Sequence, residues 1–183
     1  MQDYLVIQAK REVGIQALYA LRASQNIYVK SEKDKPFVMS SVHSLLTHCA
    51  NISKLLWSPL PRKGNKNIKS ILGVDLAEAL GIKETDFPLI RSRIFRDSLD
   101  HFDERLVEWI EKAFPTTPGK PQISVTDLVV GRAVSGPNMM NVRHYDPDTH
   151  VFTFMDDQLN LEDLKNELLK IQEIVGGPII IED

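Results

Sequence analysis

Cysteine is almost absent from this sequence, since Cys49 is the only one among 183 residues. A single cysteine cannot form an intrachain disulfide, so we expect a chain held together by a hydrophobic core in a reducing compartment, the cytoplasm. No window approaches the run of about 18 apolar residues that a membrane-spanning helix needs. No basic stretch precedes an apolar run near Met1, so we expect neither a secretory signal nor a membrane partner.

Glycine is also sparse, with 9 residues, and neither glycine nor the 10 prolines follow a period. This excludes collagen-like and low-complexity chains. Apolar residues make up 43% of the chain and charged residues 26%, which is typical of a soluble globular protein. The composition therefore predicts one domain that spans residues 1–183 and has a real core.

Charge is distributed unevenly along the chain, although the net charge is only −3. Residues 146–183 hold ten acids and two bases, whereas residues 1–145 hold twenty bases and fifteen acids. The window Lys54–Leu72 has five bases and no acid, which fits either a solvated loop or a patch that attracts phosphate. The net charge of −3 argues against tight, non-specific binding of nucleic acid over a large surface, but it is compatible with a compact site for one phosphodiester.

Apolar residues recur with helical spacing through residues 1–113, the region that we expect to form the bundle core. The predicted helices cover residues 2–24, 36–57, 67–81 and 88–113. In the second, the apolar seam steps by 4, 3, 4, 3 and 4 residues from Val38 to Leu56, as bundle helices do. The fourth predicted helix repeats this spacing from Phe95 to Ala113, before three prolines end it.

The period changes after Pro121, where β-branched residues predict a strand at 123–134. Residues 139–145 and 150–155 flank Asp146–Thr149, whose Asp-Pro start favours a tight turn, so we expect a β-hairpin there. We expect this β elaboration to cover residues 122–156 and to precede a C-terminal helix over 160–175. The predicted fold class is therefore mainly α: an up-and-down helical bundle with a small β-hairpin or sheet before the C-terminal helix.

The fourth predicted helix carries the densest charge. Asp97 and His101 are four residues apart and would share one face of a regular helix, where a carboxylate orients an imidazole. Arg96 and His101 are five apart, which is roughly 140° around the helix axis. The general alternative is that these charges are solvated pairs on the outer face of a bundle helix.

The run Arg96-Asp97-Ser98-Leu99-Asp100-His101 resembles the Arg-x4-His motif of the HEPN superfamily, in which a polar residue usually follows the arginine. The next residues, Phe102–Leu106, resemble the His-Phe-Asp-Glu-Arg-Leu stretch of uncharacterised HEPN-like bacterial proteins. This resemblance implies a HEPN-like helical bundle over residues 1–113 with the C-terminal helix packed against it. The β region would be an elaboration.

The resemblance also implies a function. Catalytic HEPN domains are metal-independent endoribonucleases, often toxins or defence effectors, and commonly homodimers. Carried over, His101 would be the general acid or base, Arg96 would bind the scissile phosphate, and Asp97 would orient the pair. No metal and no cofactor is implied. Arg93, Lys63 and Lys66 are the further candidates for RNA contacts.

Many HEPN proteins are inactive, so the alternative is a non-catalytic interaction or dimerisation module. The acidic C-terminal region and the angular offset between Arg96 and His101 favour it. In that case a partner protein, an antitoxin or a larger effector chain, would carry the activity.

The remaining cysteine, histidine and acidic residues that could bind a ligand or metal are expected to have structural roles instead. Cys49 falls on the apolar seam of the second helix and is expected in the core. Arg143, His144 and His150 flank the hairpin turn and are expected to be exposed charges, although phosphate contacts are an alternative. The acids near residue 160 lack the spacing of a calcium loop and suit the N-terminus of the last helix.

Overall fold

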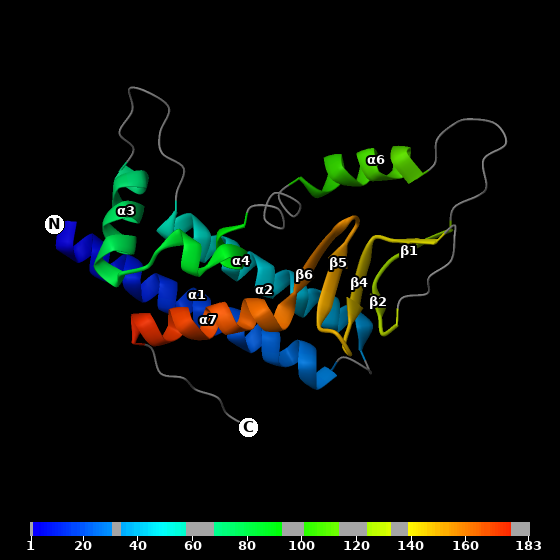
Figure 1. Ribbon diagram of the computed structural model, residues 1–183, viewed down its shortest axis with the longest axis horizontal. Helices are drawn as coiled ribbons and strands as arrows, with labels where there is room; N and C mark the ends of the chain where they lie inside the picture. The colour runs from blue at the N-terminus through cyan, green and yellow to red at the C-terminus, as the bar shows by residue number, and fades with distance from the viewer. Residues whose placement is uncertain are drawn as a thin grey trace.

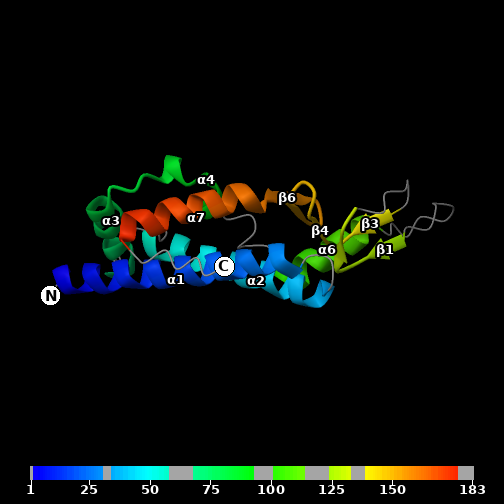
Figure 2. The ribbon, with the colours of Figure 1, turned by 90° about the horizontal axis from the view of Figure 1, so that it is seen from below.

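The fold is mainly helical, with a small mixed β-sheet placed before the C-terminal helix. The computed structural model describes residues 2–30, 34–57, 68–92, 101–113, 124–132 and 139–176. Figures 1 and 2 show three long helices lying side by side: α1 (Gln2–Lys30), α2 (Lys35–Leu56) and α7 (Leu161–Val175). They form the body of the molecule, and the sheet lies at one end of it.

Helix α2 begins and ends as its sequence predicts. The Asp34 carboxylate accepts a hydrogen bond from the Phe37 N–H at 3.1 Å, and Pro36 occupies the first turn, where its missing N–H costs nothing. The predicted apolar seam is confirmed, because all of its members are buried. They are Val38, Val42, Leu45, Cys49, Ile52 and Leu56.

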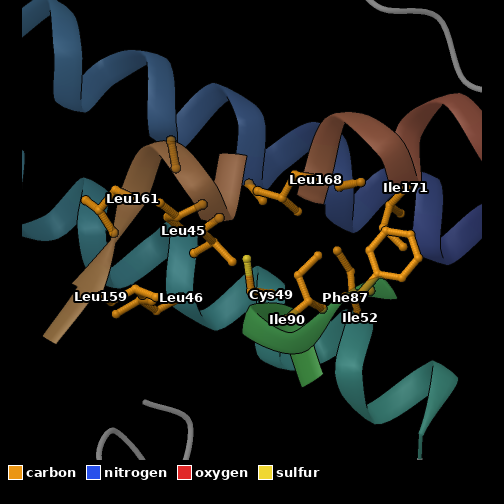
Figure 3. Close-up of a cluster of buried hydrophobic side chains, with 14 of the residues drawn as sticks. Leu45, Leu46, Cys49, Ile52, Phe87, Ile90, Leu159, Leu161, Leu168 and Ile171 are labelled. Atoms are coloured by element: carbon orange, nitrogen blue, oxygen red, sulfur yellow. The ribbon is translucent and has the colours of Figure 1, made fainter. Parts of the chain in front are cut away.

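The core lies where α2 meets α1, α7 and the short helix α4 (Pro88–Arg91) (Figure 3). Helix α1 contributes mainly small residues, and α7 contributes leucine and isoleucine. The expectation for Cys49 is confirmed, since it is 5% exposed and belongs to this core. Asn160 caps α7 by accepting the N–H groups of Glu162 and Asp163, and Gly176 ends the helix with a φ of 72°.

Helix α3 (Ile68–Leu80) lies at the end of the body opposite the sheet and contacts both α1 and α2. Gly81 follows it with a φ of 65°, a conformation that suits glycine. A short 3₁₀ turn, η1 (Glu84–Asp86), then leads into α4. Helix α4 packs against α2 and α7.

The prediction of one continuous helix over residues 88–113 is wrong. Helix α4 ends at Arg91, because Ser92 has an extended backbone with a ψ of 133°. Helix α6 (Phe102–Ala113) begins after His101 and packs on the sheet rather than in the bundle. Helix α4 therefore packs against the bundle and α6 against the sheet, although their apolar residues have similar spacing. The spacing of apolar residues does not show which surface a helix packs against.

The sheet is larger than the predicted hairpin. Its four strands stand in the order β2 (Val129–Val130), β4 (Arg143–Asp146), β5 (Val151–Phe154) and β6 (Asp157–Asn160). The hairpin between β4 and β5 is confirmed, whereas β6 extends the β region beyond residue 156 and runs directly into α7. Strand β2 pairs with β4 in parallel.

The strand predicted over 123–134 is present but interrupted. Its first part, β1 (Ser124–Thr126), pairs in parallel with β3 (Met139–Asn141), and its second part is β2. Both ladders join residues 15 positions apart, so they share one register across the gap. At the interruption, the Asp127 carboxylate binds the Arg143 guanidinium, and Leu128 adopts a φ of 55°.

None of the helices in the described ranges combines the length and the apolar character needed to cross a bilayer.

The buried carboxylate of Glu167 fixes α4 against α7. Its two oxygens accept the backbone N–H groups of Leu89 and Ile90, at 3.0 and 2.9 Å. Glu167 is only 7% exposed, and this burial raises the pKa of its carboxyl group above the usual range. The contact supplies acceptors for two N–H groups at the start of a helix, where no intrahelical acceptor exists.

We expect Glu167→Ala to lower the free energy of unfolding by about 2 kcal/mol, because it leaves two N–H groups without acceptors in a buried setting. Urea denaturation measured by circular dichroism at neutral pH tests this. The control is Glu173→Ala, an exposed glutamate of the same helix, for which we expect a change within about 0.5 kcal/mol. Equal losses in both variants would contradict the anchoring role.

Candidate functional site

His101 stands immediately before α6, and its backbone carbonyl accepts the N–H of Arg105 at 3.0 Å. The side chain is 60% exposed. Its Nδ1 lies 3.3 Å from a carboxylate oxygen of Glu104, three residues later. The histidine indicated by the motif is therefore accessible to solvent. Its carboxylate partner in the structure is Glu104, which the motif did not indicate.

Helix α6 is held on the sheet by both charge and aromatic packing. Arg105 forms an ion pair with Asp157 at 2.8 Å, and Lys112 forms one with Asp156 at 2.9 Å. The Phe102 ring lies 5.9 Å from the Phe154 ring, measured between centroids. These contacts fix the position of α6 beside the sheet (Figure 1), and with it the position of His101 at the start of the helix.

The other residues predicted for the site cannot be placed. Arg96, Asp97 and Arg93 lie outside the described residues, as do Lys63 and Lys66. Of the proposed catalytic set, the structure thus positions His101 alone. Within the described ranges, no group of three or more His, Cys, Asp or Glu side chains has a metal-binding arrangement.

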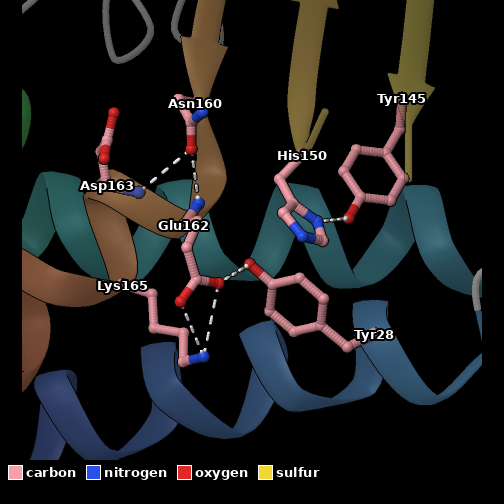
Figure 4. Close-up of polar contacts among 7 residues, drawn as sticks. All are labelled: Tyr28, Tyr145, His150, Asn160, Glu162, Asp163 and Lys165. Atoms are coloured by element: carbon pink, nitrogen blue, oxygen red, sulfur yellow. Dashed lines mark hydrogen bonds and ion pairs between the residues drawn. The ribbon is translucent and has the colours of Figure 1, made fainter. Parts of the chain in front are cut away.

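A second polar cluster joins α1, the β4–β5 hairpin and the start of α7 (Figure 4). The Tyr28 hydroxyl donates to the Glu162 carboxylate at 2.8 Å, and Lys165 approaches that carboxylate at 3.2 Å. The Lys165 ammonium also lies 5.0 Å from the centre of the Tyr28 ring. Tyr145 and His150 complete the cluster through a contact of 3.3 Å between the hydroxyl and Nδ1.

The titration of this cluster follows from its contacts. The hydrogen bond from Tyr28 is the main reason why the pKa of Glu162 lies below its usual value. Burial, followed by the bond to Glu162, raises the pKa of the Tyr28 hydroxyl. Burial likewise raises the pKa of Tyr145 to about 12. All three shifts favour a neutral tyrosine pair around an ionised glutamate at neutral pH.

The expectation that Arg143, His144 and His150 are exposed hairpin charges is wrong in this structure. His144 is 7% exposed and its Nε2 lies 2.7 Å from the carbonyl of Gly131. Arg143 is engaged by Asp127, and His150 packs edge-on against Tyr28 at 5.0 Å. Asp127, Gly131 and Tyr28 lie outside the hairpin, so the local sequence around the hairpin contains no sign of these contacts.

Comparisons with protein-family models, with curated proteins and with solved structures give no match. The functional interpretation therefore depends on the residues and their geometry.

The Tyr28 hydrogen bond should stabilise the fold by about 1 kcal/mol, a value reduced for the partial exposure of Glu162. We expect Tyr28→Phe to lose this amount near pH 7. Because the pKa of Glu162 is depressed, the difference from the parent protein should shrink as the pH falls below about 4.5.

Because the pKa of Tyr28 is raised, the same difference should also shrink when the pH rises above about 10. Urea unfolding across this pH range measures it. Tyr19→Phe, an exposed tyrosine of α1, is the control and should show no such window. A stability loss from Tyr28→Phe that is constant from pH 3 to pH 7 would contradict the role of Glu162.

Proposed function

We propose that this chain is a HEPN-like, metal-independent endoribonuclease in which His101 transfers the proton. The observation that carries the proposal is the position of His101: exposed at the start of α6, in contact with a carboxylate, within an Arg-x4-His motif. In this proposal the three long helices correspond to the HEPN-like bundle, and α6, which packs on the sheet, carries the motif histidine beside it. The β region, residues 124–160, is an elaboration of it.

The chemistry fits these residues. RNA carries its own nucleophile, the 2′-hydroxyl, so cleavage needs a group that removes its proton and one that stabilises the phosphate. An exposed imidazole can reach a polymer backbone, and the Glu104 carboxylate, 3.3 Å from Nδ1, can orient the ring during the transfer. Arg96 would stabilise the charge that develops on the phosphate, and Asp97 would orient the pair. Arg93, Lys63 and Lys66 remain the proposed RNA contacts.

We expect the purified protein to cleave structured RNA in EDTA, and His101→Ala to lower the rate by at least about 100-fold. Denaturing gel electrophoresis of labelled RNA measures both rates. Glu111→Gln is the matched control, because this exposed residue lies in the last turns of the same helix, away from His101. An absence of cleavage at high protein concentration would reject the proposal, as would equal rates for the parent and His101→Ala.

A second candidate function, a dimerisation or partner-binding module, is favoured by the outer face of α6. Val107 and Ile110 are three residues apart on this helix and are 56% and 40% exposed. Adjacent exposed apolar side chains at this spacing are typical of a helix that packs against another surface. We propose that α6 lies near the two-fold axis of a homodimer, which would bring two copies of the motif together.

Light scattering tests this assembly. We expect a mass near twice 20.8 kDa at micromolar concentration, and Val107→Asp should reduce it to the mass of one chain. Val29→Asp is the control, because Val29 is 73% exposed near the end of α1 and should leave the mass unchanged. A monomeric parent protein would exclude a site shared between two copies and leave the binding of an antitoxin or effector protein as the alternative.

A further inference from the structure

A cavity of about 250 Å³ lies between α2, the sheet and the first residue of α6. Three phenylalanines line it, Phe102 from α6 and Phe152 and Phe154 from β5. Arg143 of β4 and His43 of α2 are its polar lining residues. The described elements thus bring aromatic and cationic groups from three distant parts of the chain into one small space.

The aromatic walls have fixed positions. The rings of Phe152 and Phe154 are 6.5 Å apart with an interplanar angle of 25°, and both side chains are buried. The Phe102 ring is tilted by 42° against Phe154. The guanidinium carbon of Arg143 lies 5.5 Å from the centre of the Phe102 ring, and the same guanidinium donates hydrogen bonds to the Asp127 carboxylate.

The α2 side of the cavity is aliphatic except at His43. Met39, Val42 and Leu46 form this wall, and all three are buried. His43 is exposed, and no hydrogen bond or ion pair of its imidazole is found among the described residues. A ligand that enters the cavity would therefore meet apolar surfaces on its faces and a hydrogen-bonding ring at its edge.

We infer that this cavity holds a nucleobase of the RNA substrate, an inference that rests on the proposed function for its RNA context. A nucleobase has two π faces, which stack on aromatic side chains and on arginine, and a polar edge that suits His43. The volume is near the lower limit of ligand pockets and suits one ring system rather than an extended ligand.

The chain connects this cavity directly to the proposed catalytic residue. His101 and Phe102 are consecutive, so their Cα atoms are about 3.8 Å apart. Phe102 lines the cavity, while the side chain of His101 is exposed. In this inference, a base seated against Phe102 places its ribose and phosphate near His101. The cavity would thus select which phosphodiester reaches the imidazole.

The test is a titration of the full-length protein with AMP, GMP, CMP and UMP, followed by NMR of ¹³C-labelled methyl groups. We expect at least one nucleotide to shift the methyl resonances of Met39, Val42 and Leu46, through the ring current of the bound base. The methyl groups of Val74, on α3 at the opposite end of the molecule, should not move. Nucleotides that leave the three α2 residues unchanged would overturn the inference.

Two substitutions make the test specific. Phe102→Leu keeps an apolar contact but removes a stacking surface, and His43→Ala removes the polar edge; each should weaken nucleotide binding by about tenfold. Tyr19→Leu, an exposed aromatic residue of α1, is the matched control and should bind like the parent protein. Unchanged affinity in both cavity variants would overturn the inference.

The same measurements separate this inference from the proposed function. His101→Ala should retain nucleotide binding while it loses RNA cleavage. Binding in the cavity without any cleavage by the parent protein would uphold the cavity as a nucleobase site and reject the endoribonuclease proposal. If RNA cleavage persists and the nucleotide affinity of Phe102→Leu and His43→Ala is unaltered, the endoribonuclease proposal is upheld and the cavity is rejected as a nucleobase site.

Discussion

The packing of small residues on α1 against large residues on α2 and α7 is the constraint on which the rest of the structure depends. The buried face of α1 is mostly alanine, which allows the neighbouring helices to approach closely. At Gly14 the approach is so close that an added Cβ would lie 3.3 Å from a methyl group of Val175. Even an alanine there would require the Val175 side chain to move by a few tenths of an ångström.

Two parts of the molecule are attached to this helical body through α7. Helix α4 is attached through the Glu167 carboxylate, and the sheet is attached because β6 continues directly into the helix at Leu161. Phe152, Phe154 and Leu159 then bring the sheet into the same core. The position of α6 follows from that of the sheet, so the placement of His101 depends on α7 through several successive contacts.

The sequence predicted the elements whose signals are local. The caps of α2 and α7 and their apolar seams are set by residues within four positions of one another. The break at Ser92 could not be predicted, because the partners that separate α4 from α6 are Glu167 and the sheet. Strand β6 was missed because it has only four residues and adjoins a strong helical signal.

The candidate site shows the same division. The exposure of His101 agrees with the charged surroundings in the sequence, whereas Tyr28 and Glu162 are 134 positions apart and share no local pattern. The cavity beside Phe102 is likewise assembled from residues of α2, α6 and two strands. Only the folded chain brings these groups together, and for that reason the motif alone indicated one histidine but not its surroundings.

The interrupted parallel ladder limits how the length of this protein can vary. Because β1–β3 and β2–β4 share one offset of 15 positions, a residue added at 127 or 128 would shift one ladder relative to the other. Such a shift turns each side chain of a strand to the opposite face, and it would remove Asp127 from Arg143. Residues added between 132 and 139 would lengthen the connection and leave both registers intact. Among related sequences, insertions should therefore gather in that connection and be absent from the short segment that joins β1 to β2.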